Sequence, residues 1–331
     1  GFLMMGLNLL VGYITVRTSE NFHLVGLAKK YLGRVGESMM AAIAYLMTFG
    51  ALVIYTIGEG HILASVFGGS DFIWSLVFFF VFGTLVVIGM RSIKTVEFII
   101  SLLLLTVVFI IVYFNVPHIE VFNLNYNNLA HLLLPYGIVL FAFGGAGSIP
   151  EVHILLKHSN GSFKKAIVIA GLVVIGIYIL FAFSVVGVTG AQTTEIATIG
   201  LGNKIGPTMF LFGNIFAFLA MAGSFLMRGL SLKDSMIWDY KMPKLAANCL
   251  VLSVPLVIFL LGIRQFIAAI DIVGGVFISL EMLMVILIYW KAKQVGDLPA
   301  GKFKLHHTLL LAILLIIVIS IGAVYSVVKL F

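Results

Sequence analysis

Residues 134–157 (LPYGIVLFAFGGAGSIPEVHILLK) form the stretch whose residue types are best suited to binding a small polar ligand. Its centre holds three glycines and a proline, namely Gly144, Gly145, Gly147 and Pro150. A glycine weakens a helix by ~1 kcal/mol relative to alanine, and an interior proline costs ~3 kcal/mol. We therefore predict that the backbone of residues 143–148 is not helical and presents amide and carbonyl groups to a polar ligand.

A helix that restarts near Ile149 would direct its positive N-terminal end at this gap, where backbone amides stabilise a carboxylate. The alternative interpretation is that the glycines only let neighbouring helices approach closely. We favour a discontinuous, site-forming helix, because Ser148, Pro150 and Glu151 directly follow the glycines. The predicted ligand-binding residues of this stretch are Phe143, Gly144, Gly145, Ala146, Gly147 and Ser148.

A second candidate for chemistry is Glu59, which lies in the sequence YTIGEGH between two glycines. A carboxylate in a water-poor cavity suits a reversible proton carrier. The alternative is that Glu59 lies near the outer end of its helix and is solvated. Tyr55, about one turn earlier, is a candidate for the wall of a substrate cavity, with aromatic packing as its alternative role.

The sequence gives no sign of a metal centre, a cofactor or a catalytic site. Cys249 is the single cysteine, and the only adjacent histidines are His306 and His307. The EGH and EVH triplets do not place Glu and His on one helical face, and no Walker-type glycine loop is present. We therefore expect no enzyme activity and no bound cofactor other than a coupling proton or sodium ion.

The elements that position these residues are membrane-spanning helices. The 331 residues are 62% hydrophobic and only 10% charged, with a mean hydropathy of +1.19. Apolar runs of ~20 residues recur between short charged loops, which is the length that a helix needs to cross the bilayer. The ten spans predicted from hydropathy are residues 1–16, 38–66, 72–90, 94–114, 131–156, 163–188, 208–231, 245–262, 266–290 and 307–330.

The basic residues give these spans a direction. Of the 20 lysines and arginines, 17 lie in the loops of one side or at the span ends next to them, and Lys204, Arg264 and Lys329 lie on the other side. Short basic loops stay in the cytoplasm, which accounts for the net charge of +7 without a nucleic-acid partner and places both chain ends outside. We expect one transporter domain in the plasma (inner) membrane of a prokaryote. Because the chain opens within an apolar run, we expect an eleventh helix upstream.

The stretch FAFGGAGSIPEV resembles the sixth transmembrane helix of the amino acid/polyamine/organocation transporters, specifically the aromatic amino acid permeases and the related amino acid/auxin permeases. Two further stretches share this resemblance, GFLMMGLNLLVGYITVRT followed by LVGLAKKYLGRVGE, and AGSFLMRGLSLKDSMIWDYK. The resemblance covers nearly the whole chain. It implies a LeuT-like bundle of two inverted five-helix repeats, with the expected upstream helix as the family's first.

The sequence departs from this family at two positions. Ala146 stands where the family often has a polar residue, commonly His, so the substrate range is left open. Gly223 and Ser224 stand where sodium-coupled relatives often have Thr-Ser, so one hydroxyl is missing. The resemblance implies an ion site formed by Ser224, Gly223 and the carbonyl of Ala220, and proton coupling through Glu59 is the alternative.

The leading hypothesis is a symporter for an aromatic or neutral amino acid that works by alternating access around the broken helix. A transporter of another small organic cation or metabolite is the first alternative. An ion channel is the second, although the sequence shows no ring of like charges.

Overall fold

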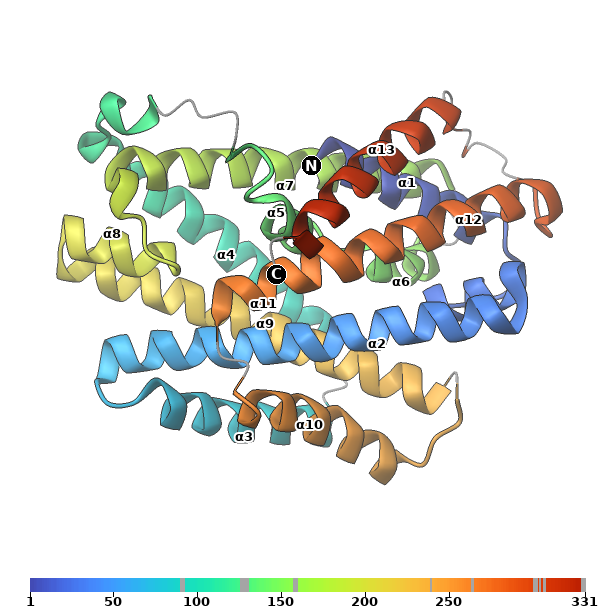
Figure 1. The fold of residues 1–331 in the computed structure, drawn as a ribbon, viewed down its shortest axis with the longest axis horizontal. Helices are drawn as coiled ribbons and strands as arrows, with labels where there is room; N and C mark the ends of the chain where they lie inside the picture. The colour runs from blue at the N-terminus through green and yellow to red at the C-terminus, as the bar shows by residue number, and fades with distance from the viewer. Residues whose placement is uncertain are drawn as a thin grey trace. The chain divides into compact units, whose positions relative to one another are not determined.

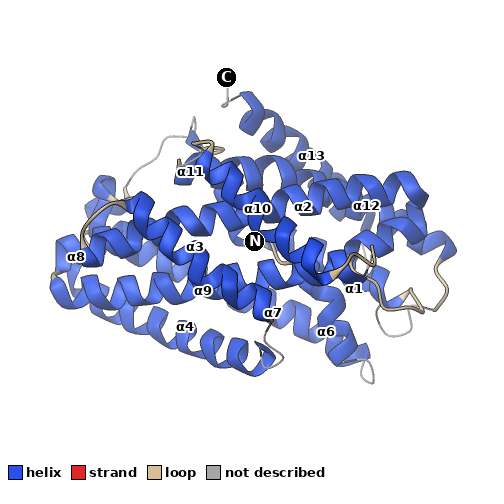
Figure 2. Cartoon of the chain, turned by 90° about the horizontal axis from the view of Figure 1, so that it is seen from below, coloured by secondary structure: helices blue, strands red, loops and turns tan. Residues whose placement is uncertain are grey.

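The computed structural model describes residues 1–89, 93–125, 131–156, 160–238, 240–262, 265–299, 303, 305 and 308–328. Within these residues every regular element is a helix (Figures 1 and 2). Eight segments of this described part are long and apolar enough to cross a membrane. Two more apolar helices, Phe2–Val16 and Lys244–Leu260, are shorter. Each of these ten segments overlaps one of the ten spans predicted from hydropathy.

The chain forms two compact units. Unit 1 comprises Gly1–Met47, Ala130–Ile175 and Ile270–Phe331, and unit 2 comprises Thr48–Leu129 and Gly176–Ala269. Three of the described helices have residues in both units, namely α2 (Leu24–Phe67), α7 (Asn160–Thr189) and α11 (Phe266–Ile272).

Unit 1 is built around α1. The helices that lie wholly within it are α1 (Phe2–Val16), α5 (Tyr136–Ala142), η4 (Ala146–Ser148), α6 (Ile149–Leu155), η6 (Val273–Ile278), α12 (Ser279–Val295) and α13 (Thr308–Val328). α1 packs against α12, α6 and α13. Gly6 faces Leu311 of α13, and Gly12 faces Phe303, which is fully buried. Small residues on α1 thus let larger apolar side chains fill the core of this unit.

Unit 2 is built around α9. Its helices are α3 (Asp71–Ile88), α4 (Ile93–Asn115), η1 (Val116–His118), η2 (Val121–Leu124), η5 (Gly190–Gln192), α8 (Ala197–Ile205), α9 (Pro207–Trp238) and α10 (Lys244–Leu260). Phe218 and Phe225 of α9 pack on Phe78 of α3, with ring centroids 6.4 and 5.2 Å apart. The ammonium of Lys233 on α9 donates to the carbonyl of Val86 in the last turn of α3. α9 therefore holds α3 by both aromatic packing and a helix cap.

α2 begins earlier than predicted. The hydropathy span starts at residue 38, whereas α2 is helical from Leu24 and is kinked at Gly33, which has φ +74° and ψ −164°. Positive φ is accessible to glycine at little cost, so the chain changes direction there. The part of α2 before Gly33 carries Lys29 and Lys30, and their charge hid it from a hydropathy prediction.

The span predicted as one helix over 266–290 contains a change of helix type. α11 and α12 are joined by η6, a π-helix over Val273–Ile278 with the sequence VGGVFI. π-Helical turns are rare and occur frequently at functional sites.

Candidate functional site

The helix predicted to break does so in unit 1 (Figure 1). α5 ends at Ala142, and the amide of Gly144 donates to the carbonyl of Phe141 at 3.2 Å, closing a tight last turn. A single 3₁₀ turn, η4, follows over Ala146–Ser148, and α6 begins at Ile149. The span predicted from residue 131 starts as α5 only at Tyr136, because Pro135 occupies the N-cap.

The interruption between α5 and α6, residues 143–148, has an open face and a face that packs against protein. A side chain at Gly147 would meet no atom within 4 Å, and one at Gly145 would meet only the carbonyl oxygen of Phe143 at 3.9 Å. A side chain at Gly144 would lie 3.0 Å from Cδ1 of Ile278 on η6. Gly145 and Gly147 therefore border space that a ligand can use, whereas Gly144 is packed against protein.

The remaining predicted residues of the interruption differ in where they point. Ala146 is buried, and the ring of Phe143 lies beside Gly1, at the start of α1. Ser148 is exposed, and its hydroxyl donates to the carbonyl of Gly145 at 2.8 Å. This hydrogen bond fixes the 3₁₀ turn and leaves the hydroxyl oxygen able to accept one from a ligand.

Glu59 is enclosed within unit 2. Its exposed fraction is 0%, and neither carboxylate oxygen has a hydrogen-bond partner among the described residues. The backbone of Ala222 on α9 faces the carboxylate without reaching hydrogen-bonding geometry. The alternative in which Glu59 is solvated is therefore wrong.

Two glycines make this enclosure possible. A side chain at Gly58 would lie 2.6 Å from Sδ of Met221 on α9 and 2.8 Å from the ring of Phe266. On the other side of α2, a side chain at Gly60 would collide with the hydroxyl of Ser75 on α3. Because neither glycine has a side chain, α3 and α9 both approach α2 closely and exclude water from Glu59.

The predicted coupling residues on α9 lie in the same stretch as Ala222. Ala220, Gly223 and Ser224 are half-buried members of this segment, and a side chain at Gly223 would lie 3.8 Å from Ile100 of α4. Tyr55 is buried one turn before Glu59. The structure thus places Glu59 beside the segment of α9 that holds the predicted coupling residues, with Ala222 and Met221 as the nearest members of that segment. The described residues contain no group of three or more His, Cys, Asp or Glu side chains that could hold a metal ion.

Comparison with known proteins gives the family. The profile of the tryptophan/tyrosine permease family matches residues 2–327. The chain belongs to this family. The permease is 24% identical over 329 residues to the tyrosine-specific transport system 1 of Haemophilus influenzae, an alignment that covers 92% of this chain and 82% of that protein. It is 25% identical over 334 residues to the glutamine transporter 2 of Aliivibrio fischeri, which covers 91% of this chain and 84% of that protein.

These similarities and the apolar helices establish a coarse description. The permease is a multi-pass integral membrane protein of an amino acid transport family, and it is not an enzyme.

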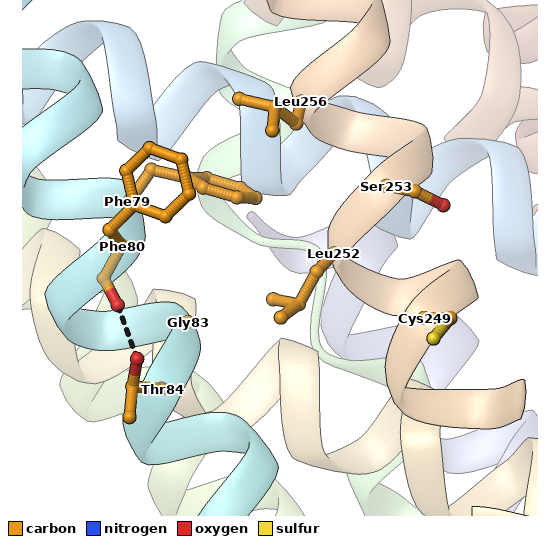
Figure 3. A pocket seen from close by; sticks show the side chains of 8 residues that line it. All are labelled: Phe79, Phe80, Gly83, Thr84, Cys249, Leu252, Ser253 and Leu256. Carbon is orange, nitrogen blue, oxygen red and sulfur yellow. Dashed lines mark hydrogen bonds between the residues drawn. The ribbon is translucent and has the colours of Figure 1, made fainter. Parts of the chain in front are cut away.

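A groove of ≈ 310 Å³ in unit 2 of the permease lies apart from the predicted residues (Figure 3). Leu252 and Leu256 point from α10 toward α3, where Phe79 and Phe80 lie, and the hydroxyl of Ser253 points away. No charged side chain lines the groove. It therefore lacks the groups that would bind both charges of an amino acid.

Sequence reasoning did not single out η6 as part of the site. The adjacent glycines at 274 and 275 were the available signal, because two glycines in a span reduce helix stability and mark close backbone approach. Asn214 of α9 is a second polar residue in the interior of unit 2 that the sequence prediction did not place in the site. Both of its side-chain amide atoms are buried without a hydrogen-bond partner in the part of the chain that the structure describes.

Proposed function

We propose that the permease is a secondary active symporter that carries an aromatic or neutral amino acid by alternating access around the α5–α6 interruption. The observation that carries the proposal is the open face at Gly145 and Gly147, in the middle of a membrane span of a tryptophan/tyrosine permease family member. Non-helical backbone at membrane depth persists only where protein buries it or where it lines a cavity.

Substrate binding uses the backbone of residues 143–148. Amide groups there donate to the substrate carboxylate, carbonyl groups accept from its ammonium group, and the Ser148 hydroxyl adds a polar contact. These groups contact only the carboxylate and the ammonium group, which all amino acids share. The rest of the binding site therefore sets the preference for a substrate side chain. The tyrosine and glutamine relatives agree with an aromatic or neutral side chain.

Glu59 is the proposed coupling group. An ionised carboxylate without a partner is strongly disfavoured in an apolar interior, so binding a proton satisfies this site. A sodium ion would need several oxygen ligands, for which Ser224 supplies one hydroxyl and Ala220 a carbonyl, while Gly223 supplies no side-chain oxygen. The burial of Glu59 therefore favours a proton over sodium as the coupling ion.

The proposal includes the surrounding architecture. We propose that the chain is one transporter domain with a LeuT-like fold of two inverted five-helix repeats, as its family resemblance implies. The permease lies in the plasma (inner) membrane of a prokaryote with its basic loops in the cytoplasm, since all but three of its lysines and arginines fall on that side.

The test is uptake into proteoliposomes that contain the full-length protein. Radiolabelled tryptophan, tyrosine, glutamine, leucine and alanine are offered under a proton gradient and, separately, under a sodium gradient. We expect saturable uptake of at least one of them, driven by the proton gradient. No uptake of any of the five by folded protein would contradict the proposed function, and uptake driven by sodium alone would contradict the role of Glu59.

A matched pair of variants locates the site. Gly145→Val places a branched side chain on the open face of the interruption and is expected to abolish uptake. Gly176→Val is the control, because a side chain at Gly176 of α7 also meets no atom within 4 Å. Equal loss of uptake in both variants would show that the interruption has no special role.

A further inference from the structure

Two irregular helices lie against each other in unit 1. α5 packs on η6, and the interruption that follows α5 meets η6 at Ile278. A side chain at Gly274 of η6 would collide with the carbonyl oxygen of Gly137, and one at Gly137 would collide with Asp271 of α11. The contact is therefore backbone against backbone, and even one added methyl group on either side would force the helices apart.

Ile278 is the last residue of η6 and reaches the interruption itself. Its side chain is 1% exposed, and Cδ1 occupies the space beside Gly144, 3.0 Å from where a side chain would begin. Gly145 and Gly147, on the open face, have no such neighbour. Ile278 thus contacts the face that packs against protein and does not border the space proposed for the substrate.

α13 supports η6 from behind. A side chain at Gly275 of η6 would collide with the hydroxyl of Ser326 on α13.

A hydrogen bond connects α5 to the end of η6. The phenol oxygen of Tyr136 and the hydroxyl oxygen of Ser279 lie 2.9 Å apart. Tyr136 begins α5, and Ser279 follows η6 directly, so this bond ties the two irregular segments together at a second point. α13 thus contacts η6, and η6 in turn contacts the interruption.

The spacing of the two residues explains how one segment makes both contacts. Residues i and i+4 lie on the same face of a helix, about one turn apart. Gly274 meets α5 and, four residues later, Ile278 meets Gly144. One face of η6 therefore contacts both α5 and the interruption.

We propose that η6 braces the interruption and that Ile278 is a positioning residue, which holds Gly144 so that the open face keeps its substrate-binding shape. The inference rests on the proposed function. It adds an element that does not touch the substrate yet sets how well the backbone of residues 143–148 fits it.

The experiment is a double-mutant cycle on uptake. Gly144→Ala adds a methyl group that meets Cδ1 of Ile278, and Ile278→Val removes that atom. We expect Gly144→Ala to raise KM about tenfold, and Ile278→Val added to it to restore most of the loss. Ile286→Val in the Gly144→Ala background is the control, because Ile286 of α12 is also 1% exposed and loses the same methyl group. The control is expected to restore nothing.

A second readout does not depend on transport. In a background without other cysteines, the rate at which a water-soluble maleimide labels Gly147→Cys reports the shape of the open face. Gly144→Ala is expected to change this rate about fivefold or more, and Ile278→Val to return it toward the original value. Monodispersity and melting temperature show that each variant is folded.

The outcomes separate the two proposals. If the unmutated protein transports none of the amino acids, the proposed function fails, and the labelling rates still decide whether Ile278 braces the interruption. The proposal that η6 braces the interruption is contradicted if Gly144→Ala has the KM of the unmutated protein. It is also contradicted if Ile278→Val and Ile286→Val restore uptake equally. A Gly147→Cys that is never labelled contradicts the open face and, with it, the brace.

Discussion

The α5–α6 interruption and the surroundings of Glu59 use glycine for opposite purposes. In the interruption, three glycines within four positions end a helix, and two of them border open space. Around Glu59, two glycines remain inside the helical part of α2 that follows Gly33, and they let α3 and α9 close over the carboxylate. The comparison shows that glycine beside a polar group does not by itself indicate broken backbone. Clustering with a following proline breaks the helix, whereas alternation with other residues yields close packing.

The largest expected effect comes from removing the proton-binding group of the packed region. Glu59→Gln keeps the shape of the side chain but cannot release a proton, so uptake driven by a proton gradient is expected to fall by ~100-fold. Exchange of labelled for unlabelled substrate, which needs no net proton movement, is expected to persist. Glu195→Gln, at an exposed position of the loop before α8, is the control and should leave both activities unchanged.

The next prediction compares glycines from the two regions directly. Gly60→Ala brings a methyl group against the Ser75 hydroxyl and within 2.6 Å of the carbonyl oxygen of Asp71, so the free energy of unfolding should fall by about 1–3 kcal/mol. Gly147→Ala meets no atom within 4 Å, so its effect should stay within about 0.5 kcal/mol. Thermal unfolding of the purified protein in detergent measures both. Equal shifts would remove the distinction between open and packed glycines.

The helices and their interruption were predictable because the forces that decide them are local. An apolar run of bilayer length must be helical, since no water is present to bind its backbone groups. The cost of glycine and proline accumulates within a few residues of sequence, so residues 143–148 indicated an interruption without knowledge of the neighbouring helices.

The environment of Glu59 and the π-helix depend on contacts between distant segments. The same YTIGEGH sequence fits a solvated carboxylate or an enclosed one, and the choice depends on Met221 and Ser75, which come from other helices. The VGGVFI segment is as apolar as its flanks, so hydropathy could not show that packing against Gly137 accompanies a wider turn there.

A smaller effect is expected from the hydrogen bond that closes the interruption. Ser148→Ala removes the bond to the carbonyl of Gly145, which contributes about 1 kcal/mol, and we expect KM to rise about fivefold with little change in kcat. Ser148→Thr keeps the hydroxyl and should retain most of the affinity. A fall in kcat with unchanged KM would indicate that Ser148 acts in a later step than binding.

The smallest expected effect extends the comparison to a carboxylate that has partners. Asp297, just after α12 in unit 1, accepts from the amide and hydroxyl of Ser19 at 3.1 and 2.8 Å and forms an ion pair with Lys30. The hydrogen bond from the Lys30 ammonium, followed by those from Ser19, lowers the pKa of Asp297 to about 2 from its ordinary 3.8. Because the pKa is lower in the folded protein, this stabilisation is present above pH 3.8 and is lost as the pH falls toward 2.

The melting temperature of Asp297→Asn should therefore lie slightly below that of the unmutated protein at pH 6, and the difference should vanish near pH 2. Salt should also reduce the difference, because the pair is solvated and screened. Glu59→Gln provides the contrast, since an unpartnered, enclosed carboxyl gains nothing from ionisation and its amide should be at least as stable at pH 6. If both substitutions lowered the melting temperature at pH 6 and converged at acid pH, Glu59 would have a charged partner in the folded protein.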